Sequence, residues 1–287
     1  MKKYSYIAAF IALISFSACE QIVELDIDSA EPQLVINSQI SNLDTTWEVQ
    51  LSMSQGYFNQ SDITLIEDAL ITISDNDGLV DTLDHLGDGL FSSVQNRSCE
   101  IGKLYTLTVN YKGETYTATE TCFYQDTIDF IESYYLPESN GFIQEGYYVF
   151  QKSGEYEPEG DYYMWQIVKN DTNLRDEIGY QLDSDEFRET GYFNINIDPN
   201  DPLKDIDRGV FPRPFPYRFE LGDEVEVYQM RISKGYFDFI NAFSTQQSRS
   251  GTPFDPPPAN PPFNIEGGAL GYFSVVNVSS ANLTVTE

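Results

Sequence analysis

The chain has 287 residues, enough for one large or two ordinary domains whose core needs neither a metal nor a disulfide. Its 46 acidic and 16 basic residues give a formal net charge of -30, which argues against binding to nucleic acid or to anionic lipid headgroups. Hydrophobic residues at 41% and aromatic residues at 14% exclude a disordered chain, and one histidine with three cysteines supplies too few ligands for a zinc cluster.

The N-terminus has the pattern of a bacterial lipoprotein signal. Two lysines precede an apolar run at 7–16 that is too short to span a bilayer. Two small residues then precede Cys19, which resembles a lipobox with Phe16 where leucine is commoner. The alternative is an ordinary secretory signal with a chance cysteine. We expect a signal peptide at 1–18 and lipidation of Cys19, which would anchor the chain to the outer membrane through its N-terminal lipid.

Residues 19–32 are expected to form a tether. Glu20, Glu24 and Asp26 follow the cysteine closely, which resembles the surface-export signal of Bacteroidota lipoproteins. A tether that is merely solvated would be acidic as well. The choice between the cell surface and the periplasmic leaflet therefore stays open.

Alternation of apolar and polar residues is the dominant signal after the tether. Tyr105, Leu107, Val109 and Tyr111 alternate with polar residues, as in a strand with one buried face. Short strands with closely spaced turns predict a sandwich or a barrel. The predicted strands are 33–40, 47–53, 71–74, 79–83, 105–111, 115–121, 129–136, 147–151, 162–168, 191–197, 224–232, 269–278 and 282–286.

Two turns predict hairpins, one at 75–78 (Asp-Asn-Asp-Gly) and one at 112–113 (Lys-Gly). In the register of the second hairpin, Cys122 lies opposite Lys103 and within reach of Cys99. An exported chain meets an oxidising compartment, so we expect a Cys99–Cys122 disulfide. The alternative is two buried free thiols.

One helix is predicted near 234–247. Ser233 can cap it, and Tyr236, Ile240 and Phe243 lie on one face, which we expect to pack on a sheet.

Six prolines fall at 252–262, which excludes regular helix or sheet there. The segment is either a rigid connector that covers a sheet edge or a docking site for a partner. Restricted prolines lose little entropy on binding, and flanking aromatic side chains supply contact area. The predicted partner-binding residues are Phe254, Pro256, Pro257, Pro258 and Phe263.

No catalytic or metal-binding residue is assigned. His85, the single histidine, is expected in a solvated turn, and the glycines at 267–271 are expected to allow tight packing rather than to cradle phosphate. The turn at 75–78 lacks the remaining ligands of a calcium loop, and the acidic cluster at 183–186 could hold Ca²⁺ only weakly at the surface. Pairs of carboxylates carry little information in so acidic a chain.

Several stretches match a known family. They include 34–40, the segment 105–109 with Gly113, and above all the run 264–273 (Asn-Ile-Glu-Gly-Gly-Ala-Leu-Gly-Tyr-Phe) after the proline-rich segment. On these residues the mature chain resembles the Bacteroidota lipoprotein family known as domain of unknown function 4249. The resemblance implies an outer-membrane lipoprotein, often encoded near TonB-dependent receptors, and it assigns no functional residue.

The first hairpins also resemble modules common in exported proteins. We therefore expect a mainly β fold, with an N-terminal immunoglobulin-like or transthyretin-like β-sandwich at 33–127. A second antiparallel β domain with one packed helix is expected at 128–287.

The leading functional hypothesis is a non-enzymatic binding or scaffolding accessory to a TonB-dependent transporter, with no cofactor. One alternative is a surface enzyme that processes glycans or peptides with carboxylates, and another is a purely structural component of a surface complex. A cleft with two facing carboxylates would favour the enzyme. An aromatic patch beside the proline-rich segment would favour the interaction protein.

Overall fold

Strands make up most of the described chain, so the prediction of a mainly β protein is confirmed. The computed structural model describes residues 31–56, 62–125, 127–138, 144–153, 160–184, 216–247 and 260–287. Its helices are α2 (Arg175–Ile178) and α4 (Lys234–Gln247). Its strands are β1 (Leu34–Ser41), β2 (Glu48–Met53), β3 (Leu70–Asp75), β4 (Gly78–Gly87), β5 (Leu90–Ser92), β6 (Leu104–Tyr111), β7 (Glu114–Thr121), β8 (Ile128–Leu136), β9 (Gly146–Ser153), β10 (Tyr162–Lys169), β11 (Thr172–Asn173), β12 (Gln181–Ser184), β13 (Glu224–Ile232) and β14 (Leu270–Thr284).

Twelve of these strands form one continuous sheet, and β8 and β9 form a second. The large sheet runs in the order β11-β10-β13-β14-β1-β2-β5-β4-β3-β6-β7, with β12 also paired to β10. Paired strands are antiparallel, with the exception of the parallel pair β1 and β14. The predicted strand at 191–197 lies outside the described residues.

The last strand, β14, changes its partner along its length. Residues 270–276 pair with β1, and residues 277–284 pair with β13. The sequence predicted two strands here, and that prediction was wrong, because pairing with β13 continues through Ser279 and Ser280 and satisfies the backbone between them.

Sharing of β14 makes the large sheet continuous across the two predicted domains. Tertiary contacts unite Pro32–Gln55 and Gln60–Glu287 in one compact unit. The division at residue 127 stays a prediction, and β14 is the strand that both parts share.

The N-terminal part of the sheet encloses the larger core. Here β4 also changes its partner, from β3 along its first half to β5 along its second, and so connects two layers. Trp47 and Tyr105, one from each layer, meet edge to face with ring centroids 5.6 Å apart. Alternating positions on the strands fill the core, among them Ile36, Ile40, Val49, Leu51, Ile71, Ile73, Leu107 and Val109.

The second half of β4 places His85 in a strand. His85 pairs with Phe91 of β5, their rings lie 5.0 Å apart, and the histidine side chain is exposed. The chain turns later, at Asp88 and Gly89, which both have positive φ. The expectation of a turn at His85 was wrong because cross-strand pairing outweighs the local Asp, His and Gly composition.

Both predicted hairpin turns are present. Asp75 Oδ1 accepts hydrogen bonds from the backbone N–H groups of Asp77 and Gly78 at 2.9 and 3.2 Å. The ammonium group of Lys103 lies 2.9 Å from the Asp75 carboxylate, which lowers the pKa of Asp75 through that hydrogen bond. Lys112 (φ 49°) and Gly113 (φ 87°) form the second turn, with the left-handed backbone of a two-residue hairpin.

Cys99 and Cys122 are buried in the N-terminal core as free thiols. The predicted register holds, because the Cys122 N–H donates to the Lys103 carbonyl at 3.0 Å. A hydrogen bond with Cys122, together with burial, raises the pKa of the Cys99 thiol. The two thiols therefore contact one another, and a disulfide in an oxidising compartment stays a prediction.

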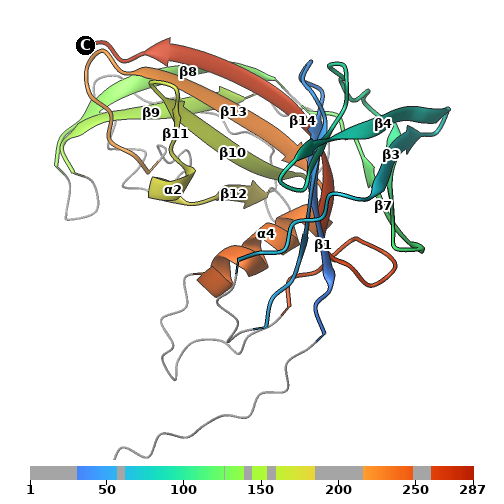
Figure 1. Ribbon diagram of the computed structural model, residues 1–287. Coiled ribbons are helices and arrows are strands. Elements are labelled where there is room, and N and C mark those ends of the chain that lie inside the picture. The colour runs from blue at the N-terminus through green and yellow to red at the C-terminus, as the bar shows by residue number, and fades with distance from the viewer. Residues whose placement is uncertain are drawn as a thin grey trace, which may run out of the picture. The chain divides into compact units, whose positions relative to one another are not determined.

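In the C-terminal part of the sheet, β10 and β13 bury both faces. One face carries Ile167 and Val227, which pack with Ile131 and Val149 of β8 and β9. The other face packs against α4, which lies on the opposite side of these strands from β8 and β9 (Figure 1). Because both faces are covered, the neighbours Tyr162 and Tyr163 are both buried although they point in opposite directions.

Buried polar side chains secure the β8–β9 sheet on β13. The side-chain amide of Gln151 in β9 donates to the side-chain oxygen of Gln229 in β13, and Gln125 donates to the Gln229 carbonyl at 2.9 Å. Arg231 is buried and pairs with Asp161. Since buried polar groups are costly when unpaired, this network fixes the position of β13.

The contact between β14 and β1 depends on Gly271. Its φ is +105°, and a Cβ built there would lie 2.0 Å from the Ile36 carbonyl oxygen. We expect Gly271→Ala to lower the free energy of unfolding by about 3 kcal/mol, because it adds a backbone clash to left-handed strain. Chemical denaturation monitored by circular dichroism measures the change.

Gly268→Ala is the matched control for that experiment. Gly268 has a φ of +89° but nothing within 4 Å of its Cβ position, so only the backbone strain applies, about 1 kcal/mol. An equal decrease in the free energy of unfolding of both variants would contradict the role given to the β1–β14 contact.

Candidate ligand-binding cleft

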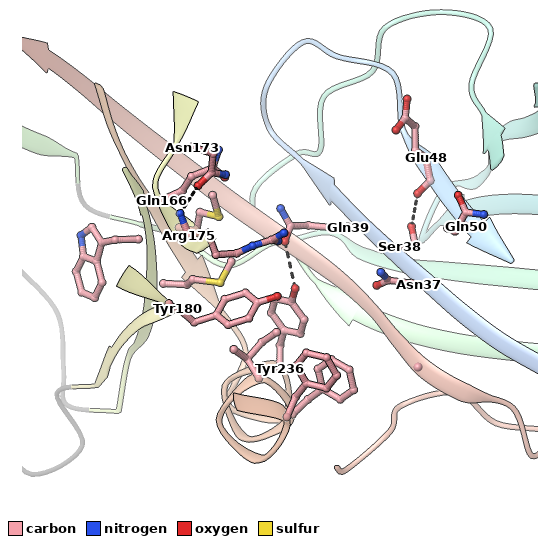
Figure 2. Close-up of a pocket in the computed structure, with 18 of the residues that line it drawn as sticks. Asn37, Ser38, Gln39, Glu48, Gln50, Gln166, Asn173, Arg175, Tyr180 and Tyr236 are labelled. Atoms are coloured by element: carbon pink, nitrogen blue, oxygen red, sulfur yellow. Dashed lines mark hydrogen bonds between the residues drawn. The ribbon is translucent and has the colours of Figure 1, made fainter. Parts of the chain in front are cut away.

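A cavity of about 620 Å³ lies between β1 and β2 on one side and β10 and β13 on the other, with α4 beside them. Figure 2 shows its side chains, which come from segments far apart in the sequence. Small-molecule sites in proteins have volumes of roughly 300 to 1,000 Å³, so the cavity has the size of such a site. We refer to it as the cleft.

The first wall of the cleft is the polar face of β1 and β2. Alternation along β1 buries Ile36 and Ile40 in the core and turns Asn37 and Gln39 to the opposite face, which lines the cleft. Glu48 and Gln50 occupy the corresponding face of β2. The packing of the core thus determines which side chains of β1 and β2 line the cleft.

The second wall comes from β10, β13 and the chain after β11. Met164 and Gln166 share one face of β10, and Met230 lies beside Met164 on β13. Asn173 Oδ1 accepts a hydrogen bond from the Arg175 backbone N–H at 2.9 Å. The Arg175 guanidinium lies 5.5 Å from the centre of the Tyr180 ring, in a cation–π contact at the rim.

The helix α4 lines the cleft with aromatic side chains. As the sequence predicted, Ser233 caps the helix, its Oγ accepting a hydrogen bond from the Tyr236 N–H at 3.1 Å. The Tyr236 and Phe239 rings are nearly parallel at 13°, and those of Phe239 and Phe243 at 12°. Helical spacing therefore produces a row of three rings along the cleft.

One hydrogen bond joins α4 to the first wall. The Tyr236 hydroxyl donates to Gln39 Oε1 at 3.3 Å, and Figure 2 shows this contact within the cleft. Burial raises the pKa of Tyr236 to about 12, so the hydroxyl is protonated and able to donate at neutral pH.

Some polar side chains of the cleft are satisfied by the protein and others are not. Gln50 Nε2 donates to the Asp88 carbonyl at 2.7 Å, and Ser38 Oγ donates to the Glu48 carbonyl at 2.8 Å. Among the described residues, the side-chain amides of Asn37 and Gln166 make no hydrogen bond. Each has donors and an acceptor available for a ligand.

Charged side chains are few in the cleft. Of the described residues that line it, only Glu48 and Arg175 carry charge, and they lie on opposite walls. The cleft is thus close to neutral although the chain has a net charge of -30.

The aromatic row continues onto the surface. The Phe239 and Phe263 rings lie 6.3 Å apart, and Phe243 and Phe263 are 38% and 37% exposed. Phe263 directly follows the proline-rich segment in the sequence, and residues 252–259 of that segment lie outside the described chain. We call Phe239, Phe243 and Phe263 the aromatic patch.

The other predicted site residues fall outside the described chain. These are Cys19, Phe254, Pro256, Pro257 and Pro258, together with Asp185 and Glu186 of the acidic cluster. In the part that the structure describes, no group of three or more Asp, Glu, His or Cys side chains could hold a metal ion. Within the same residues, no helix is long and apolar enough to cross a membrane.

Sequence reasoning missed the cleft itself. Asn37, Gln39 and Gln50 occupy the polar positions of alternating strands, a pattern that equally describes a face open to water. The sequence did indicate Tyr236, Ile240 and Phe243, as the packed face of the predicted helix, and all three line the cleft. The useful signal was the aromatic spacing of that helix.

A half-buried carboxylate holds the start of α4 against β7. Glu120 accepts hydrogen bonds from the hydroxyls of Ser233 at 2.7 Å and Tyr272 at 3.4 Å. Burial raises the pKa of Glu120, and the bonds from Ser233, Thr121 and Tyr272 offset part of that shift. Since Ser233 is also the helix cap, this cluster sets where the aromatic row begins.

The raised pKa of Glu120 predicts a pH-dependent stability. A carboxyl whose pKa is higher in the folded state than in the unfolded state stabilises the fold at acid pH, and this contribution is lost as the pH rises through the folded value. We expect Glu120→Gln to raise the melting temperature at pH 7, because glutamine keeps an acceptor for Ser233 without the buried charge. The gain should vanish below about pH 4, where the wild-type carboxyl is protonated.

Differential scanning calorimetry at pH 7 and pH 3.5 measures this difference. Glu114→Gln, at an exposed position of the same strand, is the control for the loss of one negative charge. An equal gain in both variants, or a gain that persists at low pH, would show that burial of Glu120 is not the cause.

The sequence places the chain in a family without an assigned activity. Among curated proteins, none matches the chain. A family model matches residues 20–282, nearly all of the chain beyond the predicted signal peptide. On this match the chain belongs to the family described as Domain of unknown function (DUF4249), as the run at 264–273 indicated.

Proposed function

We propose that the protein is an outer-membrane lipoprotein that binds a ligand in the cleft without transforming it, as an accessory to a TonB-dependent transporter. The observation that carries the proposal is the cleft, a cavity of about 620 Å³ that both parts of the sheet and α4 build together. Its free amide groups and its aromatic row are the features of a site that holds a molecule by shape and hydrogen bonds.

Binding accounts for the cleft better than carboxylate catalysis does. Hydrolysis of a glycosidic bond uses two carboxyl groups about 5 to 9.5 Å apart. Glu48 is the single carboxylate among the described residues that line the cleft. The geometry therefore favours binding over an enzyme of that class.

A purely structural role gives no task to two polar side chains of the cleft. The side chains of Asn37 and Gln166 line the cavity and, within the described chain, make no hydrogen bond. Asn37 is exposed and Gln166 is half-buried, so water reaches both amides in the cleft and a ligand can replace it. A ligand that bonds to these amides gives them a role.

The aromatic patch supports a contact with a partner protein. Exposed aromatic side chains are enriched at protein interfaces, and Phe263 is exposed and packs on Phe239, which lines the cleft. The family resemblance implies that genes of this type lie near TonB-dependent receptors. We therefore assign Phe263, the member of the patch that does not line the cleft, to the transporter contact.

Lipidation would hold the binding site at the membrane. We expect Cys19→Ala to move the protein to the soluble fraction or to leave the precursor unprocessed, since no other segment is predicted to anchor it. Membrane fractionation and the mass of the mature chain measure both effects. Ser17→Ala keeps a small residue in the signal and should behave as wild type, whereas full membrane retention of Cys19→Ala would contradict the anchor.

Ligand binding can be tested before the ligand is known. Melting temperatures are measured with a mixed panel of neutral sugars, amino acids, short peptides, nucleotides and carboxylates. At about 100 times its dissociation constant, a true ligand should raise the melting temperature by about 5 to 10 °C. We expect Leu90→Trp, which fills the cleft from β5, to abolish that shift, and the compound to be recovered unchanged.

Leu86→Trp adds the same bulk at an exposed position of β4 and should keep the shift. No stabilising compound, an equal shift in both tryptophan variants, or chemical conversion of the compound would contradict the proposal.

A further inference from the structure

We infer that the ligand of the cleft is a neutral compound with hydroxyl-bearing rings, a short oligosaccharide. This inference rests on the proposed function and specifies the ligand class of the same site. Four properties of the described residues lead to it: the charge of the cleft, the type of its hydrogen-bonding groups, the arrangement of its rings and the pairing of its strands.

The charge of the cleft favours a neutral ligand. Glu48 and Arg175 lie on opposite walls and cannot together concentrate one sign of charge. An anion would also be repelled by a chain of net charge -30. A cation would find one carboxylate, whereas buried or half-buried ions need several partners.

The hydrogen-bonding groups match hydroxyl groups. Asn37, Gln39 and Gln166 present amides, each with donors and an acceptor. A hydroxyl group also donates and accepts, so it can bond to an amide in either sense. The protonated Tyr236 hydroxyl adds a group of the same kind to the site.

The rings supply flat apolar surfaces of the size of a sugar ring. Tyr236, Phe239 and Phe243 follow one another with interplanar angles of 13° and 12°. A sugar ring has an apolar face of C–H groups, which packs on an aromatic face while its hydroxyls point outward to polar groups. The hydrogen bond between Tyr236 and Gln39 brings the first ring of this row next to an amide of β1, so a ligand on that ring also lies near β1.

The strand pairing argues against an extended peptide. Such peptides are usually bound as an added strand at a free sheet edge. In the cleft, β1 lies between β14 and β2, β2 between β1 and β5, and β13 between β10 and β14. β10 is paired on both sides as well, so the backbone of these strands is occupied and recognition must use side chains.

The test uses the lipidated mature protein in detergent and an array of neutral oligosaccharides, with charged glycans and peptides of similar size as separate arms. Isothermal titration then gives the affinity of each neutral oligosaccharide that binds. We expect Asn37→Ala and Gln166→Ala each to lower that affinity about threefold to tenfold through the loss of one hydrogen bond. Phe243→Ala should lower it by a similar factor through the loss of a stacking surface.

None of the three cleft variants is expected to impair folding. Asn37 and Gln166 make no side-chain hydrogen bond within the described chain, and Phe243 is partly exposed, so melting temperatures should stay near the wild-type value. Asn241→Ala removes an exposed amide of α4 that does not line the cleft, and it should leave the affinity unchanged.

Binding of neutral oligosaccharides that the three cleft variants weaken and Asn241→Ala does not would support the inference. Oligosaccharide binding that all variants retain would overturn it, because the site would lie elsewhere. Binding of peptides or charged glycans that Leu90→Trp abolishes would overturn the ligand class and leave the proposed function standing. No binding in any arm, with no stabilising compound in the mixed panel, would overturn both.

Discussion

The parallel contact of β1 with β14 at Gly271 is the constraint on which the rest of the structure depends. A glycine with positive φ lets the two backbones approach so closely that any side chain would meet the Ile36 carbonyl. Through this contact β14 joins β1 on one side, while its second half joins β13. The N-terminal core, the β10–β13 strands and α4 are thereby held in one unit, and the cleft lies where they meet.

The cleft forms because β1 and β2 turn apolar side chains to the core and polar side chains to the opposite face. Burying Ile36, Ile40, Val49 and Leu51 stabilises the core by about 1.5 to 3 kcal/mol for each side chain. The same packing fixes the backbone of β1 and β2, and with it the positions of Asn37, Gln39 and Gln50 on the other face. A ligand then meets groups that are already ordered, which lowers the entropy lost on binding.

The chemistry of the cleft contrasts with that of the whole chain. The protein is strongly acidic, yet the site that it builds is nearly neutral and combines amides with aromatic rings. Net charge affects solubility and association rates without deciding what a site binds. Under the proposed function, specificity resides in a few side chains from β1, β10 and α4, and the lipid proposed at Cys19 holds them at the membrane.

The local features of the fold could be predicted from the sequence. These features depend on interactions within a few residues or within one hairpin. They are the strand periods, the turns at Asp75–Gly78 and Lys112–Gly113, the register of Cys122 with Lys103, and the Ser233 cap. Family membership likewise followed from the run at 264–273.

The tertiary structure decided the features that depend on contacts between residues far apart in the sequence. It made β14 one strand, because β13 supplies backbone partners where the sequence has two serines, and it placed His85 opposite Phe91 in β4. It also turned the polar face of β1 into a wall of the cleft. A polar residue in an alternating strand has the same pattern whether it faces water or a cavity, and only the packing of α4 and β10 near β1 distinguishes the two.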